Sequence, residues 1–365
     1  MDDSPDPAGP FMQQLVQIRG RGAAQNPKNR FEQAEYVPDL EAVDDDEPGP
    51  RTQFLRDHTR GIISRNDSPD IPFETSVNPY RGCEHGCIYC FARPTHEYLG
   101  FSAGLDFETR ILVKHEAPEL LRKELASPKW TGQPIAMSGV TDPYQPVERR
   151  LGITRACLEV LAEFRNPVAM VTKNHLVTRD IDLLGELAAH QAAVVNLSVT
   201  TLNEKLQRVM EPRASTPARR LEAVRRLAEA GIPVRVLVAP VMPGLTDHEM
   251  PAIIAAAAEA GATAASYIPL RLPHGLKGLF EDWLQTHFPD RRDKVLNRIR
   301  EMRGGKLYDS EWGTRMRGEG LFADQYEALF GAACRKHGLV RDFPPLSSAG
   351  FRRPHDRAGQ MGLFG

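Results

Sequence analysis

Apolar runs rich in β-branched residues alternate with amphipathic stretches from about residue 76 to about residue 270. Such near-continuous runs are typical of parallel strands buried on both faces, and the amphipathic stretches have the period of helices packed on a sheet. The alternation predicts an α/β fold with a parallel sheet covered by helices. Six strands are expected, at Ser76–Tyr80, Ile135–Gly139, Val168–Thr172, Val194–Val199, Val234–Ala239 and Ala264–Pro269.

Helix boundary signals lie between several of these runs. Thr154 is expected to cap a helix with one apolar face. Thr216 opens another predicted helix, which ends at Gly231. Thr246 and Glu249 have the spacing of a capping box ahead of an Ala-rich helix. These helices would connect successive strands, as strand–helix repeats require.

Residues 1–70 lack apolar periodicity and are rich in Pro, Asp, Arg and Gly. This composition predicts an extended, partly ordered N-terminal arm. The arm contains the acidic run Asp44–Glu47 and the basic stretch Arg19–Gly22. The basic stretch could contact phosphate or RNA, although such residues in an arm are more often only solvated.

Residues 71–273 contain the strand–helix repeats, and the pattern changes after them. Residues 274–345 are predicted as a helical C-terminal extension, with helices at 276–287 and 294–302 before a glycine-rich, irregular stretch. Residues 346–365 are predicted as a flexible tail. We therefore expect one large domain with added segments at both ends.

Polar or small residues follow several of the predicted strands. An open doubly wound sheet and a barrel both fit the pattern, and in either fold ligands bind at the carboxyl ends of the strands. The residues at these ends should therefore converge on one rim: Ser138, Gly139, Lys173, Asn174, Ser198, Thr200 and Arg271.

The charge balance gives no general attraction to polyanions. Lys and Arg number 46 against 48 Asp and Glu, for a net charge of -2, so any contact with nucleic acid would be local. Residues 291–317, which contain nine Lys or Arg and four Asp or Glu, could provide one or could be a solvated helix face. Residues 1–10 do not resemble a secretory signal, and no apolar run approaches the roughly 18 residues that span a bilayer. A cytoplasmic protein without a membrane partner is expected.

Three of the five cysteines lie within eight positions, which predicts a metal site in a reduced compartment and not a disulfide framework. Cys83, Cys87 and Cys90 follow a predicted strand at spacings of four and three. Gly82 and Gly86 allow the backbone to wrap closely around an inorganic core. Thiolates bind iron–sulphur clusters and zinc alike, so the number of ligands has to decide between them.

A structural zinc site needs four ligands, and His85 or His96 could complete one. A catalytic cluster needs only three, which leaves one iron open. Cys157 and Cys334 are remote in sequence, and Cys157 lies on the apolar face of a predicted helix. Ligand softness and number favour the cluster, with zinc as the alternative.

The stretch Arg81–Cys90 resembles the cluster loop of the radical S-adenosylmethionine (radical SAM) superfamily, which has three cysteines at this spacing and an aromatic residue, here Tyr89, before the last. The resemblance covers roughly residues 76–271 and is closest to the spore photoproduct lyase-like branch. It implies a partial (β/α)6 TIM-like barrel with an N-terminal arm and a helical C-terminal extension. It also implies a 4Fe-4S cluster with S-adenosyl-L-methionine bound at the open iron.

The resemblance also implies which residues bind the cofactor. Lys173 is similar to a lysine that pairs with the carboxylate of S-adenosylmethionine, and Ser198 to a serine that contacts it. Ser138 and Gly139 lie where the superfamily presents backbone groups to the methionine amine. Tyr89 would lie near the adenine.

Two further residues are cofactor-binding candidates. Asp142 lies in a stretch, 141–148, that resembles the lyase group, so Asp142 and Glu148 could orient cofactor or substrate; the alternative is a turn with capping carboxylates. Arg213 could bind an anionic group in a bidentate manner or form an ordinary ion pair. For Ser138 and Ser198 the alternative is a strand-end hydroxyl that holds a loop.

The activity that the resemblance implies is reductive cleavage of S-adenosylmethionine to a 5′-deoxyadenosyl radical, which abstracts hydrogen from an unknown substrate. Nucleic acid is the candidate substrate, and an electron donor of the flavodoxin or ferredoxin type is the implied partner. The lyase uses a cysteine after the second strand, whereas Ser138–Asp142 contains none, which argues against photolesion repair. The alternative is a noncatalytic module that binds zinc or an iron–sulphur cluster.

Overall fold

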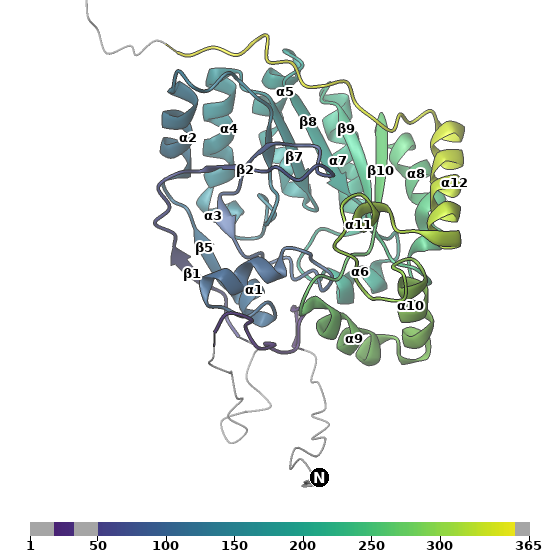
Figure 1. Cartoon of the computed structure of the whole chain (residues 1–365). Helices are drawn as coiled ribbons and strands as arrows, with labels where there is room; N and C mark the ends of the chain where they lie inside the picture. The colour runs from purple at the N-terminus through teal and green to yellow at the C-terminus, as the bar shows by residue number, and fades with distance from the viewer. Residues whose placement is uncertain (1–17, 33–49, 355–365) are drawn as a thin grey trace, which may run out of the picture.

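A seven-stranded sheet forms the centre of the molecule, which the computed structural model describes over residues 18–32 and 50–354 (Figure 1). The acidic run Asp44–Glu47 lies outside the described residues. The order of the strands in the sheet is β10-β9-β8-β7-β6-β3-β2. Their bounds are β2 Ile63–Arg65, β3 Thr75–Val77, β6 Ile135–Met137, β7 Val168–Thr172, β8 Ala193–Ser198, β9 Val234–Val241 and β10 Ala264–Pro269.

Six of these strands are parallel and follow one another in sequence order, whereas β2 is antiparallel to β3. A doubly wound sheet would instead reverse its order at a switch point. Within the described residues β10 does not pair with β2 or β3. The predicted partial (β/α)6 barrel is therefore confirmed as an open, singly wound sheet.

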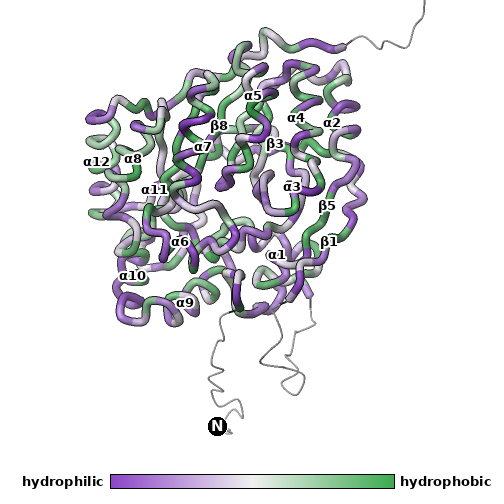
Figure 2. Tube along the Cα trace, turned by 180° about the vertical axis from the view of Figure 1, so that it is seen from behind, coloured by the Kyte–Doolittle hydropathy of each residue, from purple (hydrophilic) through white to green (hydrophobic). Residues whose placement is uncertain are grey.

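Helices surround the sheet on its outer side (Figure 1). The strands and the helix faces packed on them are the hydrophobic parts in Figure 2, as burial of one apolar face predicts. None of the described helices is long and apolar enough to cross a bilayer. The outer helices are α2 Ala117–Ala126, α4 Ile153–Phe164, α5 Ile181–Ala188, α7 Pro217–Glu229, α8 Met250–Glu259 and α12 Gly320–His337.

Side chains on β7 and β9 alternate between two environments. Val168, Met170 and Thr172 are buried, whereas Ala169 and Val171 between them are partly accessible. Strand β9 shows the same alternation over its first six residues. Because neighbouring side chains of a strand point to opposite faces, the accessible set faces the concave side. That side therefore retains open space at these strands.

The predicted strand Ser76–Tyr80 is two strands, β3 and β4 (Tyr80–Arg81), which belong to different sheets. Pro79 between them has no amide hydrogen for a continuous ladder. Strand β4 pairs with β5 (Arg110–Val113), which pairs with β1 (Gln53–Arg56) and is preceded by helix α1 (Leu105–Thr109). This three-stranded sheet leads directly into the cysteine stretch.

The helix caps agree with the sequence in one case and differ in two. Thr216 caps α7 as predicted, because its hydroxyl accepts a hydrogen bond from the amide of Arg219. Helix α4 instead begins after Gly152, and the Thr154 hydroxyl donates to a carbonyl in the preceding loop. The capping box is wrong as well: Thr246 accepts from the amide of Met242, and the Glu249 carboxylate binds the Thr201–Leu202 turn.

The C-terminal extension is more helical than predicted. Helices α9 (Leu276–His287) and α10 (Pro289–Glu301) correspond to the two expected ones. A short helix, α11 (Thr314–Arg317), and the long helix α12 lie where irregular sequence was expected. Glycines at both ends of α12 and one inside it hide the pattern, and packing against α8 and the barrel core stabilises the helix.

Residues 347–353 lie across the amino ends of the strands, at the upper edge of the sheet in Figure 1. The amide of Ser347 donates to the carbonyl of Gln191, and the amide of Arg352 donates to that of Phe164. The ring of Phe351 packs against Gly132. The first part of the segment predicted as a flexible tail thus has fixed contacts; the division of the chain into four segments stays a prediction.

Candidate active site at the cysteine loop

Cys83, Cys87 and Cys90 lie on a loop that follows β4 at the carboxyl ends of the parallel strands. Three backbone amides of this loop donate hydrogen bonds to acceptors in other segments of the chain. Cys83 N donates to Phe107 O at 2.9 Å, Ile88 N to Met210 O at 3.1 Å, and Glu84 N to the Gln145 side chain at 3.0 Å. All three thiols are free, and Cys83 and Cys87 are buried. These hydrogen bonds tie the cysteine loop to three other segments of the chain.

Burial raises the pKa of all three thiols above its ordinary value. The carboxylate of Asp142 raises the pKa of Cys83 further, and that of Glu211 does so for Cys87, while the Lys173 ammonium opposes the shift at Cys87. The thiols are thus protonated at neutral pH and would release protons to a metal. No group of three or more His, Cys, Asp or Glu side chains among the described residues is arranged to hold a single metal ion.

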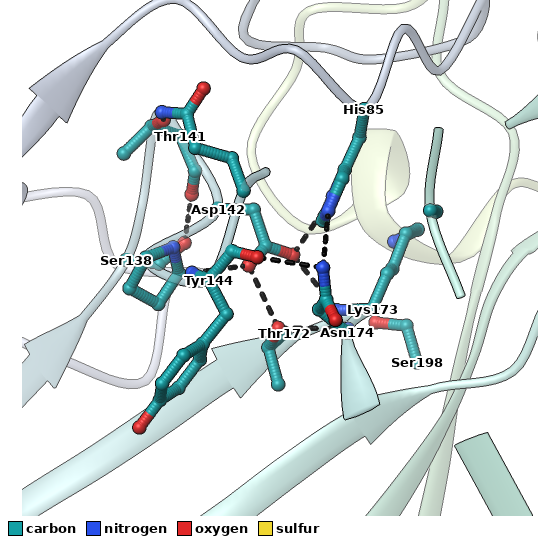
Figure 3. A network of polar contacts seen from close by, with 12 residues as sticks. His85, Ser138, Thr141, Asp142, Tyr144, Thr172, Lys173, Asn174 and Ser198 are labelled. Atoms are coloured by element: carbon teal, nitrogen blue, oxygen red, sulfur yellow. Dashed lines mark hydrogen bonds and ion pairs between the residues drawn. The ribbon is translucent and has the colours of Figure 1, made fainter. Parts of the chain in front are cut away.

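Lys173 follows β7 and lies close to the cysteine loop. Its ammonium is 5.8 Å from the centre of the Tyr89 ring and acts electrostatically on Cys87 and Glu211. Ser198 is the last residue of the neighbouring strand β8 and is buried. It follows Leu197, which is paired with Thr172 of β7. Figure 3 shows Lys173 and Ser198 on the same side of these strand ends. The structure thus brings together the predicted residues Tyr89, Lys173 and Ser198.

Tyr89 is fixed by a buried acid that sequence reasoning missed. The Tyr89 hydroxyl donates to Glu211, which also accepts from Thr200 and forms an ion pair with Arg220. Burial alone would raise the pKa of Glu211, but Arg220 and Lys173 outweigh it and hold that pKa below its usual value. Glu211 therefore stays ionised and orients the Tyr89 ring. Only the neighbouring Arg213 had been singled out from this stretch.

Asp142 joins the end of β7 to the middle of the cysteine loop (Figure 3). Its carboxylate accepts from the Thr172 hydroxyl at 2.7 Å and from the Lys173 amide at 2.8 Å, and lies 3.3 Å from Nδ1 of His85. Burial opposes ionisation, but His85 and these donors outweigh it, so the pKa of Asp142 is lowered. The other nitrogen of His85 lies 3.2 Å from the side-chain amide of Asn174. Asp142 thus positions His85 between two of the cysteines.

Ser138 and Gly139 follow β6 at the same rim. The Ser138 hydroxyl donates to the carbonyl of Thr141, and its backbone has the left-handed φ of 107° that is unusual for a serine. The hydroxyl of Thr141 in turn donates to Gly82 O at 2.6 Å. Ser138 therefore ties the rim loop to the cysteine loop. A Cβ added to Gly139 would be in ordinary van der Waals contact with the side chain of Asn78, at 3.6 Å.

Two predicted candidates are engaged within the protein. Arg213 forms an ion pair with Glu84 at 3.0 Å, and its amide donates to His85 O, so it clamps the cysteine loop. Glu148 is fully buried and binds Tyr80 and Arg179, so it lies in a buried polar network and not at the rim.

His96, which could have completed a zinc site, binds a backbone carbonyl instead. Its Nε2 lies 2.9 Å from Arg110 O, and its ring packs edge-on against Phe107. Burial lowers the pKa of His96 to about 4, so the ring is neutral. His96 therefore supports the loop from behind near Gly82.

Four of the nine basic residues in 291–317 are engaged within the protein. Arg292, Arg298 and Arg315 form ion pairs with acidic side chains, and Arg303 is buried and donates to two carbonyls. The local excess of positive charge therefore makes a smaller basic surface than the sequence suggested.

Arg271 after β10 is different. Its guanidinium lies 5.5 Å from the centre of the Phe91 ring. Phe91 directly follows Cys90 in the sequence and is 52% exposed. Its Nε is buried without a hydrogen-bond partner, and its Nη1 lies 3.0 Å from the sulphur of Met316. No ion pair of Arg271 is found among the described residues. Arg271 and Phe91 thus present an unpaired cation and an exposed aromatic ring next to the cysteine loop.

Comparisons with known proteins agree with this geometry. The radical SAM superfamily profile matches residues 77–257. An uncharacterised protein of Mycobacterium tuberculosis is 38% identical over 234 residues, which cover 64% of this chain and 68% of that protein. An uncharacterised protein of Methanocaldococcus jannaschii is 29% identical over 173 residues, or 47% of this chain and 62% of that one.

The fold is also similar to solved structures. Spore photoproduct lyase complexed with dinucleoside spore photoproduct superposes with a TM-score of 0.55 at 16% identity, over 80% of this chain and 82% of the lyase. The same lyase in a mutant form with bound S-adenosylmethionine gives a TM-score of 0.55 over 80% of this chain and 81% of that one. The profile match and the mycobacterial relative show the family, and the lyase shows the fold. The chain belongs to the radical SAM superfamily.

Proposed function

We propose that this protein is a radical SAM enzyme in which Cys83, Cys87 and Cys90 bind a 4Fe-4S cluster. The observation that carries the proposal is the convergence of three thiols, the Lys173 cation and the Tyr89 ring at the carboxyl ends of the strands. Soft thiolate donors suit iron–sulphur clusters.

The number of thiols also suits a cluster with one open iron. The remaining cysteines, Cys157 in α4 and Cys334 in α12, are buried in the barrel core, away from the cysteine loop. A structural zinc ion needs a fourth ligand beside the three thiols. The two histidines nearby are engaged elsewhere, His96 with the Arg110 carbonyl and His85 with Asp142 and Asn174. This favours a cluster with three protein ligands over zinc.

When bound, the cluster and S-adenosylmethionine would supply reductive cleavage to a 5′-deoxyadenosyl radical that abstracts hydrogen. We infer that Lys173 pairs with the cofactor carboxylate, that Ser198 hydrogen-bonds to the cofactor, and that the Tyr89 ring lies beside the adenine. We also propose that the backbone of Gly139, which follows β6 at the same rim, meets the methionine amine. We assign Ser138, Asp142 and Arg213 to holding the rim and the cysteine loop, since their side chains are already engaged there.

The substrate we propose is nucleic acid. Base stacking on an exposed aromatic ring beside a cation is a common mode of single-strand binding, and Phe91 with Arg271 offers both. The similar lyase was solved with a dinucleoside spore photoproduct, but this chain has no cysteine between Ser138 and Asp142. We therefore propose hydrogen abstraction from nucleic acid without lesion repair. Superfamily enzymes need a reductant, for which we propose a flavodoxin or ferredoxin type.

The enzyme activity can be tested by anaerobic reconstitution with iron and sulphide, followed by reduction and addition of S-adenosylmethionine. Release of 5′-deoxyadenosine is expected from the unmodified protein and from the Cys334→Ala control, but not from Cys87→Ala. A protein that binds stoichiometric zinc and releases no 5′-deoxyadenosine would contradict the proposal.

A further inference from the structure

Part of the N-terminal arm is packed against the cysteine loop. In Figure 1 this dark purple segment passes below α1 near the cysteine end of the sheet. We define residues 18–27 as the cover segment. Within it Ala23 is 2% exposed and Arg21 is 9% exposed, values typical of a protein interior and not of a solvated arm. The cover segment is therefore an integral part of the fold, although it is remote in sequence from the loop it touches.

One buried carboxylate fastens the cover segment. Glu108 in α1 is fully buried and accepts from Gly22 N at 3.0 Å and from Ala23 N at 2.9 Å. The Arg21 guanidinium donates to the carbonyl of the same glutamate at 3.0 Å. Charge-assisted hydrogen bonds to a buried acid are stronger than neutral ones. Loss of this acceptor would release two amides at once.

The same carboxylate is linked to the cysteine loop itself. Arg93, which is also fully buried, forms an ion pair with Glu108 at 2.5 Å. Its Nε donates to the carbonyl of Cys87 at 3.0 Å. Glu108 is therefore connected to the backbone of Cys87 through the side chain of Arg93.

The closest contact is between two glycines. A Cβ on Gly22 would lie 1.8 Å from Gly86 O and 3.3 Å from Ile88 N. Because the obstruction is backbone, the cover segment could not stay in place with any side chain at this position. The Gly22 backbone thus lies directly over the Gly86–Ile88 edge of the loop.

We propose that the cover segment is one wall of the cluster site, and that it closes the Gly86–Ile88 edge of the cysteine loop with Glu108 as its positioning residue. A closed wall would keep solvent and oxidants away from Cys87. The cluster part of this inference rests on the function proposed above. The closure itself concerns only residues of the chain.

The test compares full-length Gly22→Ala with the unmodified protein and with Gly185→Ala, an equivalent change in α5 where a Cβ meets nothing within 4 Å. Metal-free protein is alkylated anaerobically, and the rate at each cysteine is read by mass spectrometry. Cys87 should react roughly tenfold faster in Gly22→Ala, a loss of about 1.4 kcal/mol in closing free energy. Cys157 and Cys334 should be unchanged, as should every cysteine in the control.

An unchanged rate at Cys87, or equal acceleration at all five cysteines, would overturn the inference. If Gly22→Ala does not fold, Glu108→Gln provides the same comparison by weakening the acceptor. A second measurement follows iron release to a chelator in air from the reconstituted proteins, which should be severalfold faster in either variant. If the unmodified protein binds no cluster, the proposed function fails while the alkylation result still decides whether the segment closes the loop.

Discussion

Glu211 is the buried acid on which the rim of the site depends. It holds Tyr89 by one oxygen and Arg220 by the other, and Arg220 also donates to the carbonyl of Ser198 at 3.1 Å. One side chain thus supports two of the residues proposed to contact the cofactor. Its replacement should affect stability as well as the site.

Glu211→Gln should lower the free energy of unfolding by about 3–5 kcal/mol, because it leaves the Arg220 charge buried without a partner. Chemical denaturation of the metal-free protein measures this loss. The matched control is Glu222→Gln, whose ion pair with Arg225 is exposed, and which should change stability by less than about 1 kcal/mol. Equal losses in the two variants would contradict the role of Glu211.

His96 makes stability depend on pH. Burial lowers its pKa to about 4, below its value of about 6.5 in the unfolded chain. As the pH falls from about 6.5 to about 4, the unfolded chain binds the proton first, so stability is lost in this window by up to about 3 kcal/mol. His96→Gln should lack this part of the loss. The measurement is the difference between the two unfolding free energies across the window; a difference that does not vary with pH would contradict it.

Individual site residues could be predicted from the sequence only where a motif or an apolar run lies next to them in the chain. The three cysteines and Tyr89 form a motif within eight residues, and Lys173 and Ser198 each end an apolar run. Glu108 and Glu211 carry no such signal, because Glu108 binds Gly22 and Ala23, and Glu211 binds Tyr89, across 85 or more positions of sequence. Long-range pairs of this kind follow from the tertiary fold and not from spacing.

The capping residue of α7 gives a test of element stability. The Thr216 hydroxyl accepts from the amide of Arg219, one of the donors that the helix leaves without a partner. Thr216→Ala should lower the free energy of unfolding by about 1 kcal/mol. Thr263→Ala, at an exposed position before β10, is the control and should change it by less than about 0.5 kcal/mol. An equal loss in the control would show that the cap contributes nothing.

The strands and connecting helices of the barrel followed from sequence, since five of the six predicted strands are single strands at or near the expected positions. The sixth is divided at Pro79 into β3 and β4, which belong to different sheets. The sequence does not indicate which sheet each half joins. Helix α12 was missed because its stability comes from packing on α8 and the barrel core and not from a clear apolar period. The cover segment was predicted as part of an extended, partly ordered arm for a similar reason: Glu108, which holds it in place, is 85 or more residues away.

Different segments cover the two ends of the parallel strands. Residues 347–353 lie across the amino ends of the strands, while the cysteine loop, the cover segment and the rim residues lie at the carboxyl ends. Access to the proposed site is therefore expected from the rim, where Phe91 and Arg271 are placed.

Arg271→Ala should weaken binding of a single-stranded oligonucleotide roughly tenfold, because it removes the unpaired cation beside Phe91. Arg225→Ala in α7 is the matched control and should leave the affinity unchanged. Fluorescence anisotropy at several salt concentrations measures both, and the salt dependence should be shallower for Arg271→Ala. Identical affinities for the two variants would argue against nucleic acid at this rim.

The central claim is that three thiolates hold an iron–sulphur cluster whose remaining iron is open to S-adenosylmethionine. Electron paramagnetic resonance of the reduced, reconstituted protein with and without S-adenosylmethionine tests it most directly. We predict the signal of a reduced 4Fe-4S cluster that shifts when S-adenosylmethionine is added. A signal that is absent, or that stays the same after the addition, would contradict the account.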